Sequence, residues 1–514
     1  MTLIILFSTL FITIILCVSS ARILGVFPHF GKSHHQVYLP YMHELANCGH
    51  YILIISYFES SHPNITDISL NSIKPTFENS KEIPDISSFR LRDWLSEILL
   101  LYRLAQDTEN LFEVQGVKEL VNNNSQKFDL VITEHFNSEF ALGFAVKYNA
   151  PFILLSSCAL LPWTASAVGQ PHEVLYRPAT ASGLSQNMNL YEKFQNILYT
   201  FGWNLVFRLF HRPWSQRIIR EKLNLQLNIN DFVLKASLVL VNSHFSMNGP
   251  YPLVPQIVEV GGLHIKQPDR LPQDIQKFLD ESEHGVIYFC MGSILRGETF
   301  PEKKRQMFLN VFNKLPQRVL WKYEGENLPW KSLNIMTKKW MPQREILAHP
   351  NVKLFISHGG MLSTTEAVYE GVPIIAMPIF ADQMTNIKGV MTSGAAELLN
   401  YNNLEENEIL TKIVAMINNP IYKQKAKELA ERFHDRPLTP LKTAVYWTEY
   451  VIQHKSDHHI KSSAVEMSWY QNYMIDVILV ALIFLTVICF TFFYFSLKIL
   501  HFFQLMLKLK KYNV

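Results

Sequence analysis

Residues 340–383 hold a set of side chains whose types and spacing are suited to binding a charged ligand. They occur as Trp340-Met-Pro-Gln343, the turn His358-Gly-Gly360, Ser363-Thr-Thr-Glu366 and the pair Asp382-Gln383. The glycines of the turn carry no side-chain bulk, so the backbone can approach a ligand closely. A helix that begins after such a turn presents free N–H groups and the positive end of its dipole to an anion. The run therefore predicts a phosphate-binding site.

Alternating strands and helices must position these residues. Residues 354–357 are predicted to form a buried strand that leads into the glycine turn, and residues 361–370 form the helix after it. Residues 373–378 are predicted as the next strand, which places Asp382 and Gln383 at its carboxyl end. Ligands of doubly wound sheets bind at these carboxyl ends.

The same alternation occurs in both halves of the chain. In the first half, strands are predicted at residues 22–27, 51–55, 128–133 and 151–155. In the second half, which begins near Gly285, strands at residues 286–290 and 319–323 flank a helix at 303–313. Such alternation favours parallel sheets. We therefore expect an α/β fold in which two doubly wound sheets face each other across a cleft.

One sequence motif resembles a phosphate loop but lacks a glycine that this loop requires. Gly31-Lys32-Ser33 follows a strand and precedes a helix, as a phosphate loop does. That loop also needs a glycine at the position of Val26, whereas Gly25 is one residue too early. The sequence also lacks G-x-G-x-x-G. A nucleotide triphosphatase and a dinucleotide-dependent oxidoreductase are therefore disfavoured.

Composition and charge exclude several classes of protein. The chain has 514 residues, 48% of them hydrophobic, which is ordinary for globular domains with large cores. There are 47 Lys and Arg against 44 Asp and Glu. The lysines of the C-terminal segment, Lys498, Lys508, Lys510 and Lys511, account for the excess, and the remainder is nearly neutral. Nucleic acid is not expected as a partner, because phosphate backbones demand a basic surface.

Two apolar runs predict targeting to a membrane. Residues 1–20 contain no charged side chain and end in small residues, as a secretory signal peptide does. Residues 477–497 are also free of charge and span roughly 31 Å as a helix, enough to cross a bilayer. The lysines after this run place residues 498–514 in the cytosol and the body in the lumen.

The lumenal side is consistent with two glycosylation triplets and with few cysteines. The triplets begin at Asn64 and Asn123. Cys48, Cys158 and Cys290 lie outside the two apolar runs, and their spacing predicts neither a disulfide framework nor a zinc site. No metal site is expected.

These motifs together resemble those of a known family. The run from Trp340 to Asn386 resembles the donor-site signature of the UDP-glycosyltransferase family, which includes the animal UDP-glucuronosyltransferases. Residues 240–250 and 260–264 and the C-terminal apolar run resemble insect members. The resemblance covers nearly the whole chain. It implies a GT-B fold of two Rossmann-like domains, with the UDP-sugar as a co-substrate held by the C-terminal domain and no cofactor.

The resemblance implies roles at the two ends of the donor. Trp340 would stack on uracil, and Gln343 would hold the nucleoside end. Glu366 would accept hydrogen bonds from the ribose hydroxyls. Asp382 and Gln383 would hold the hydroxyls of the sugar.

The resemblance also implies how the diphosphate is held. His358 and the backbone N–H of Ser363 would bind it, next to the Gly360 turn, and Ser293 would add a hydroxyl. Vertebrate members usually have Asn-Gly where Leu362-Ser363 stands here. The phosphate contact of that Asn is therefore lost or replaced.

The family's general base is the His of a Ser-His pair after the first strand, which is Ser33-His34 here. An acceptor hydroxyl must lose its proton as it attacks, and imidazole titrates near neutral pH. The adjacent His35 is the alternative. The family places an Asp after the third predicted strand to orient the base. Glu134 stands there in this chain, and Glu139 is a second candidate.

The implied reaction is a direct displacement with inversion, in which His34 takes the acceptor proton and UDP leaves. The donor sugar is glucose or glucuronate, and the insect-like stretches favour glucose. A glucuronate carboxylate would need a cation, for which Lys266 and Arg270 are candidates. The acceptor is expected to be a small lipophilic alcohol or phenol, because its half of the chain offers the apolar residues Phe30, Phe58, Trp94, Leu99 and Leu100.

Two other functions compete with this one. A degenerate homologue that binds a UDP-sugar or a lipophile without transfer would lack the base or its carboxylate. A receptor or adhesion protein would not need the run at residues 340–383. The presence of His34 and of the donor residues favours the enzyme.

The sequence thus predicts a single-pass type I protein of the endoplasmic reticulum membrane, with a lumenal active site and in contact with membrane lipid. The oligomeric state is left open, and a homo-oligomer is among the states that the sequence allows. The predicted segments are a signal peptide (1–20), an acceptor-binding domain (21–240), a connector (241–284), a UDP-sugar-binding domain (285–440), a helix and juxtamembrane segment (441–476), a transmembrane helix (477–497) and a cytosolic tail (498–514).

Overall fold

The structure is a computed structural model that describes residues 20–75, 91–292, 297–325, 334–454 and 459–512. The predicted signal peptide and Ser293 therefore lie outside the described residues, apart from Ser20. The chain divides into two compact units, residues 1–461 and residues 462–514.

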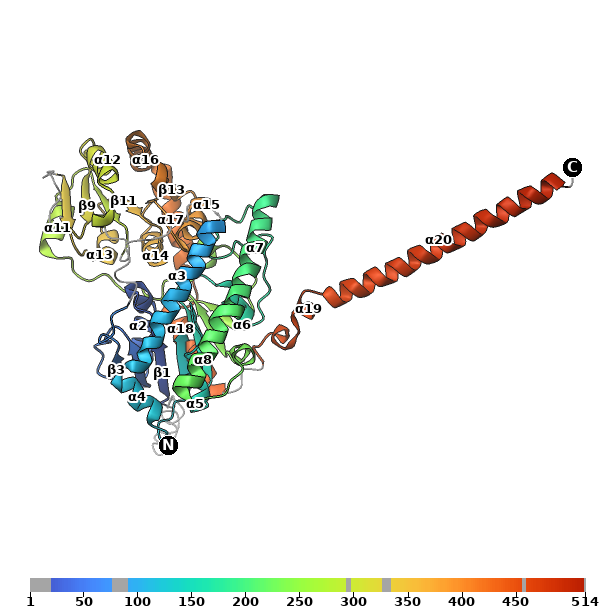
Figure 1. Cartoon of the computed structure of the whole chain (residues 1–514). Helices are drawn as coiled ribbons and strands as arrows, with labels where there is room; N and C mark the ends of the chain where they lie inside the picture. The colour runs from blue at the N-terminus through green and yellow to red at the C-terminus, as the bar shows by residue number, and fades with distance from the viewer. Residues whose placement is uncertain (1–19, 76–90, 293–296, 326–333, 455–458, 513–514) are drawn as a thin grey trace, which may run out of the picture. The chain divides into compact units, whose positions relative to one another are not determined.

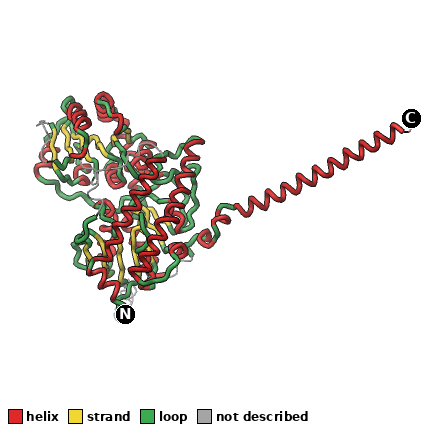
Figure 2. Tube along the Cα trace, viewed as in Figure 1, coloured by secondary structure: helices red, strands yellow, loops and turns green. Residues whose placement is uncertain are grey.

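The first unit contains two fully parallel sheets (Figures 1 and 2). The first sheet has the strand order β3-β2-β1-β4-β5-β6-β7. Its strands are β1 (Arg22–Phe27), β2 (Tyr51–Ser56), β3 (Ile65–Ser69), β4 (Leu130–Glu134), β5 (Phe152–Ser156), β6 (Leu238–Val241) and β7 (Ile257–Glu259).

This sheet is buried on both faces, which explains its unbroken apolar strands. Leu24 and Val26 belong to the core on one face, and Ile23 and Phe27 to the core on the other. The helices that accompany this sheet in the chain are α2 (Lys32–Asn47), α3 (Leu91–Glu109), α4 (Gln115–Asn122), α5 (Leu142–Tyr148), α6 (Pro162–Ala167), α7 (Leu190–Val206), α8 (Arg212–Leu223) and α9 (Ile229–Phe232). The short α10 (Phe245–Asn248) instead packs on the second domain, whose core includes Met247.

The second sheet has the strand order β10-β9-β8-β11-β12-β13. Its strands are β8 (Val286–Cys290), β9 (Arg318–Lys322), β10 (Ile335–Lys338), β11 (Val352–Ser357), β12 (Ile374–Ala376) and β13 (Ala396–Leu398). Its helices are α11 (Gln273–Asp280), α12 (Glu302–Phe312), α13 (Gln343–Leu347), α14 (Met361–Tyr369), α15 (Gln383–Thr392), α16 (Glu406–Asn418) and α17 (Pro420–His434).

Both sheets reverse their strand order at the equivalent place. In the first sheet the reversal lies between β1 and β4, and in the second between β8 and β11. Loops after the two central strands diverge there and leave a crevice, where doubly wound folds bind ligands. The predicted α/β fold with two doubly wound sheets is confirmed.

Two segments differ from the predicted division of the chain. Residues 241–284, expected to be a connector, contribute β7 to the first sheet. The helix α18 (Pro440–His454) packs on α2 and β6, although it follows the second sheet in the chain. Ala444 and Val451 enter the core of the first domain, and Thr448 is hydrogen-bonded to Tyr41. The chain thus returns to its first domain and ties the two halves together.

The second unit contains a short helix, α19 (Trp469–Asn472), and the long α20 (Ile475–Tyr512). Within α20, Ile475–Lys508 is long and apolar enough to cross a membrane, and its apolar window is not buried in the protein. The predicted span at residues 477–497 lies inside this helix, which makes it a candidate membrane span by length and composition.

Candidate active site

One cavity of about 680 Å³ lies between the two sheets and receives side chains from both. Its wall contains nearly all of the site residues predicted from the sequence. They are His34 from the first domain and Trp340, Gln343, His358, Gly360, Ser363, Glu366, Asp382 and Gln383 from the second.

His34 and Glu134 meet at the reversal point of the first sheet. His34 lies in the first turn of α2, after β1, and Glu134 is the last residue of β4. The Nδ1 of His34 lies 2.6 Å from the Oε1 of Glu134 and 3.0 Å from the Oγ of Ser157. These contacts hold the ring by one nitrogen, and His34 also lines the cavity.

The Glu134 carboxylate is buried and yet held in its charged form. Burial raises the pKa of Glu134, but the charge and hydrogen bond of His34, with smaller effects of His29 and Ser157, outweigh it. The pKa of Glu134 therefore lies below its ordinary value. A buried carboxylate beside imidazole stabilises the protonated ring.

The two alternatives from the sequence are occupied elsewhere. His35 is buried against Phe58 and Tyr38, and this burial lowers its pKa to about 4. Glu139 binds the Nε2 of His135 at 2.9 Å and the Nε of Arg212 at 3.0 Å. The structure thus brings His34 to Glu134 and leaves His35 and Glu139 in the packing of the domain.

His29 lies beside this pair, and no motif in the sequence predicted its place there. Its ring stacks on His34 with centroids 3.8 Å apart, and its Nδ1 accepts a hydrogen bond from the backbone N–H of Gly31 at 2.9 Å. Burial, with the charge of His34, lowers the pKa of His29 to about 3. The imidazole of His29 is therefore neutral, and the ring of His34 stacks against it.

At the reversal point of the second sheet, His358 is enclosed by glycines. A Cβ on Gly292 would lie 2.6 Å from the His358 ring, and a Cβ on Gly360 would lie 2.5 Å from it. Gly292 has a φ of +87°, which glycine adopts without strain. Burial and the charge of Lys322 lower the pKa of His358 to about 4, so its ring is neutral. A side chain at either position would displace the His358 ring, and Gly360 is also the N-cap of α14.

Gln343, Ser363 and Glu366 form a connected group on α13 and α14. The Nε2 of Gln343 donates to the Oγ of Ser363 at 3.0 Å and to the Oε2 of Glu366 at 2.7 Å. Burial raises the pKa of Glu366 to about 7, although the hydrogen bond from Gln343 opposes the rise. His264, whose Nε2 lies 3.6 Å from Glu366, completes the group.

Asp382 and Gln383 stand at the N-terminus of α15. The Oε1 of Gln383 accepts the backbone N–H groups of Ile379 at 2.8 Å and of Phe380 at 3.2 Å, which fixes its amide. The Oδ2 of Asp382 accepts the amide of Asn386 at 3.0 Å. Burial raises the pKa of Asp382.

Trp340 projects into the cleft with 53% of its surface exposed. The Nζ of Lys32, from the first domain, lies 3.8 Å from the centre of its ring, and the Nζ of Lys322 lies 5.7 Å from it. Lys322 also donates to the backbone oxygen of Gly292 at 3.0 Å. Two cations from two domains thus converge on this aromatic ring. Lys32 belongs to the Gly31-Lys32-Ser33 motif that failed as a phosphate loop.

The part of the cavity formed by α3, α6 and α7 is mainly apolar. Its lining includes Phe30, Leu100, Leu101, Leu104, Phe136, Leu161, Trp163 and Trp203. Of the apolar residues suggested by the sequence, Phe30 and Leu100 lie here, whereas Leu99 is exposed on the surface. Glu97 is the acid in this part. Its Oε2 accepts the hydroxyl of Tyr199 at 3.0 Å, and burial raises its pKa to about 8.

Two Rossmann-like domains with a shared cleft, a His–Glu pair on one side and a glycine-flanked helix N-terminus on the other define a glycosyltransferase of the GT-B class. Solved structures support this fold. An anthocyanidin 3-O-glucosyltransferase in complex with UDP matches with a TM-score of 0.56 at 15% identity, over 85% of this chain and 99% of that one. The calicheamicin glycosyltransferase CalG4 matches with a TM-score of 0.57 at 16% identity, over 84% and 98%.

Sequence comparisons identify the family. The family model described as UDP-glucoronosyl and UDP-glucosyl transferase matches residues 96–511. UDP-glycosyltransferase UGT5 of Dactylopius coccus is 44% identical over 93% of this chain and 92% of its own length. UDP-glucosyltransferase 2 of the same species is 38% identical over 94% of both. The human UDP-glucuronosyltransferase 2B7 is 29% identical over 85% of both. The chain belongs to this family of UDP-glycosyltransferases, as the sequence motifs predicted.

Proposed function

We propose that this protein transfers glucose from UDP-glucose to a hydroxyl of a small lipophilic acceptor, with inversion and with His34 as the general base. The observation that carries the proposal is the His34–Glu134 contact in the wall of the cavity that also holds the donor residues. A degenerate homologue would have no need for a charged, buried Glu134 directed at this histidine.

In the proposed reaction, the free ring nitrogen of His34 takes the proton of the acceptor hydroxyl while its oxygen attacks the anomeric carbon. A bond forms from the acceptor oxygen to that carbon, and the bond to the UDP oxygen breaks. Glu134 stabilises the imidazolium that forms. UDP leaves with the electron pair, and the N-terminus of α14 and Lys322 stabilise its charge. An α-linked donor gives a β-glycoside, and the UDP-sugar is a co-substrate with no cofactor proposed.

The proposed donor contacts follow the arrangement of the site. Trp340 stacks on uracil, and the group of Gln343 and Glu366 holds the nucleoside end. His358 and the Ser363 N–H bind the diphosphate, where Gly360 allows close approach. Asp382 and Gln383 bind the sugar hydroxyls. Ser293, which lies outside the described residues, remains a proposed hydroxyl donor to the diphosphate.

The charges around Asp382 favour glucose over glucuronate. Asp382 and Glu97 are both acids in the wall of the cavity, and the charge of Asp382 contributes to the raised pKa of Glu97. The Lys and Arg residues among the described cavity wall are Lys266, Lys322 and Arg344. Lys266 is largely exposed and pairs with Asp269, Lys322 pairs with Glu324, and Arg344 pairs with Glu370. A glucuronate carboxylate near Asp382 would therefore face a like charge and no unpaired cation among these residues, at a cost that glucose avoids.

We further propose that α20 anchors the protein as a type I membrane protein of the endoplasmic reticulum, with the cavity in the lumen and the signal peptide removed. The exposed side chains of Asn64 and Asn123 support glycosylation on that side. A lumenal transferase for lipophilic acceptors would serve in detoxification.

A donor and acceptor panel tests the proposed function. The full chain in detergent should turn over UDP-glucose with 1-naphthol faster than UDP-glucuronate or UDP-galactose, and NMR of the product should show a β-linkage. Binding of UDP without turnover of any donor would establish a degenerate homologue instead. A preference for glucuronate would contradict the charge argument.

A further inference from the structure

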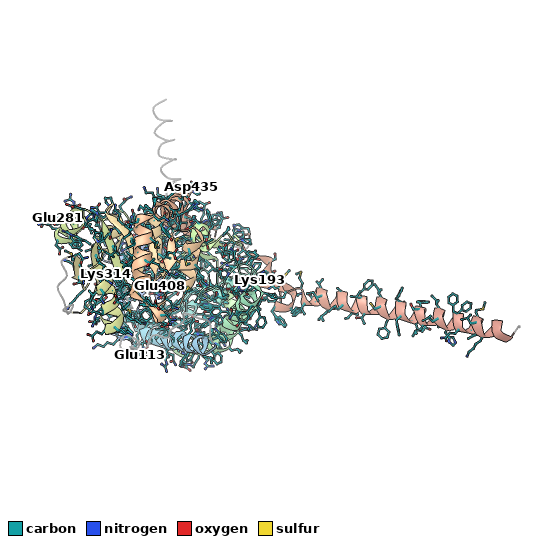
Figure 3. All side chains as sticks on the ribbon, turned by 90° about the horizontal axis from the view of Figure 1, so that it is seen from above. Glu113, Lys193, Glu281, Lys314, Glu408 and Asp435 are labelled. Atoms are coloured by element: carbon teal, nitrogen blue, oxygen red, sulfur yellow. The ribbon has the colours of Figure 1, made fainter. Side chains whose placement is uncertain are left out.

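Glu97 is an acid buried in the mainly apolar part of the cavity wall. Charged side chains usually lie at the surface, as Glu113, Glu281 and Asp435 do in Figure 3. Glu97 is 6% exposed, and the described wall residues from α3, α6 and α7 include no other Asp or Glu. Burial of a carboxyl costs free energy unless its oxygens find partners, so the partners of Glu97 indicate what it binds.

One oxygen of Glu97 is held by a chain of hydrogen bonds from α7. α3 runs beside α7 (Figure 1), and the hydroxyl of Tyr199 donates to the Oε2 of Glu97 at 3.0 Å. The indole of Trp203 is in turn hydrogen-bonded to the Tyr199 hydroxyl, whose single proton is thereby directed at Glu97. Within the part of the chain that the structure describes, the Oε1 of Glu97 has no hydrogen-bond partner. This second oxygen is therefore available to a molecule in the cavity.

Trp163 supplies another polar group on the same wall. It is 4% exposed, it lines the cavity, and the centroid of its ring lies 5.6 Å from that of Trp203. Its buried indole N–H has no hydrogen-bond partner among the described residues. Buried donors are nearly always hydrogen-bonded in folded proteins, so this N–H in a cavity wall points to a ligand that brings an acceptor.

The chemistry of the two groups favours an oxygen over a cation. An indole N–H can only donate a hydrogen bond. Burial raises the pKa of Glu97 to about 8, an effect that Tyr199 opposes and the charge of Asp382 increases, so the carboxyl keeps its proton at neutral pH. A carboxyl that stays protonated in an apolar site acts as a hydrogen-bond donor. Two donors in an aromatic wall suit a carbonyl oxygen.

We propose that Glu97, together with Trp163, is a specificity-determining residue that binds a carbonyl oxygen of the acceptor, at a distance from the hydroxyl that is glycosylated. The acceptor class is then a phenolic ketone or a related hydroxylated carbonyl compound. This inference rests on the proposed function, because His34 defines which hydroxyl reacts. The transfer step is unchanged, since the carbonyl is bound and none of its bonds breaks.

Three phenols of one skeleton test the proposal. 4-(4-Hydroxyphenyl)butan-2-one carries the carbonyl, 4-(3-methylbutyl)phenol has a methyl group in place of its oxygen, and 4-(3-aminobutyl)phenol carries a cation there. The saturated linker insulates the phenol from these groups, and a second set with one fewer carbon covers a shorter spacing. The full chain in detergent is used. Binding to the UDP-loaded protein is followed by tryptophan fluorescence, and turnover is measured separately with UDP-glucose.

The wild type should prefer the ketone to the hydrocarbon by about three- to tenfold, both in Kd and in kcat/KM. Glu97→Leu should bring the two compounds to within about twofold of each other. Asp107→Leu is the matched control, because Asp107 lies on the same α3, is 7% exposed against 6% for Glu97, and is outside the cavity wall. Both variants should lower the melting temperature, and only Glu97→Leu should change the preference.

The proton of Glu97 gives a readout that a packing role alone would not change. As pH rises from 7 to 9, the carboxyl loses the proton that it donates, so the preference for the ketone should fall in the wild type. It should persist in Glu97→Gln, whose amide keeps a donor at every pH.

Equal preference for the ketone in the wild type and in Glu97→Leu, with both linker lengths, would overturn the proposal. Tighter binding of the ammonium compound than of the ketone would also overturn it, because Glu97 would then act as an anion. Binding of the ketone that depends on Glu97 but leads to no transfer would support the subsite and contradict the proposed transferase function.

Discussion

Replacement of Glu134 by glutamine isolates the charge of the proposed catalytic pair. Glutamine keeps the size of the side chain and a hydrogen-bond acceptor near the Nδ1 of His34, which now lies 2.6 Å from the carboxylate. What it removes is the negative charge opposite the imidazolium that forms as the acceptor loses its proton. The loss should therefore appear in the chemical step and not in donor binding.

The magnitude follows from the geometry. The two side chains are 15% and 3% exposed, so solvent screens their interaction little. Two unit charges about 4 Å apart at an effective dielectric constant of about 20 interact by about 4 kcal/mol. Each 1.36 kcal/mol corresponds to about tenfold in rate, so Glu134→Gln should lower kcat by roughly 10²–10³-fold once the retained hydrogen bond is allowed for.

The assay is single-turnover transfer from UDP-glucose to 1-naphthol, with UDP affinity measured by calorimetry. Glu139→Gln is the control, because Glu139 is equally buried but is paired with Arg212 and His135. It should lower the melting temperature and leave kcat within a few-fold. If Glu134→Gln kept more than a third of the wild-type kcat, or if both variants lost the same activity, the assignment of Glu134 would be wrong.

Three further predictions concern the base and the nucleoside end. His34→Ala should lower kcat by about 10²–10⁴-fold with unchanged UDP affinity, whereas His35→Ala, a core change, should lower the melting temperature and spare the rate per folded molecule. Burial raises the pKa of Glu366 to about 7, so UDP should bind more tightly as pH rises from 6 to 8 and the carboxylate forms. Glu366→Gln should flatten this dependence of UDP affinity on pH. A flat wild-type profile in calorimetry would exclude the carboxylate as the ribose acceptor. Lys32→Met should tighten uridine binding about two- to fivefold, because an ammonium worth about 0.5–1 kcal/mol on the Trp340 ring no longer has to be displaced; unchanged affinity would show that uracil does not use that face.

The sign of the Glu366 effect on stability is opposite to that on binding. A carboxyl whose pKa is raised by burial keeps its proton in the folded state when the unfolded chain has already released it. Stability is therefore full below the ordinary pKa of glutamate, near 4.5, and falls as pH rises toward about 7. Urea denaturation of wild type and Glu366→Gln at pH 5 and pH 7.5 would show whether this loss is specific to Glu366.

The central strands were predictable from sequence, and the edges were not. Residues 22–27 and 286–290 coincide with β1 and β8, because strands buried on both faces are unbroken apolar runs. β10 and β13 are short edge strands, and Glu397 lies within the three residues of β13. The return of α18 to the first sheet depends on contacts such as Tyr41 with Thr448, 407 residues apart, which no local pattern reports.

The site residues also differ in how well the sequence predicted them. Apart from Ser293, the predicted donor residues lie within residues 340–383, a continuous run from just before α13 to the start of α15, so their spacing in sequence reflects their spacing in space. The choice between Glu134 and Glu139 needs the neighbour relation of β1 and β4 and the direction of each side chain, which only the fold supplies. His29, Glu97 and Lys322 are single residues without a motif, and their roles follow from burial beside other groups.

The repeated strand order supports the proposed function, in which one cavity activates an acceptor and stabilises a leaving group. In each domain, the residues at or just after the carboxyl ends of the two strands that flank the reversal point form the site. After β1 and β4 these are His34 and Glu134, a charged pair; after β8 and β11 they are Gly292 and His358, where bulk is removed and the histidine is neutral. The first arrangement suits proton removal, and the second suits close approach of a diphosphate to a helix N-terminus. Because both sheets end at the same cleft, an acceptor oxygen and a departing phosphate oxygen can lie on opposite sides of one anomeric carbon, which is the geometry that inversion requires.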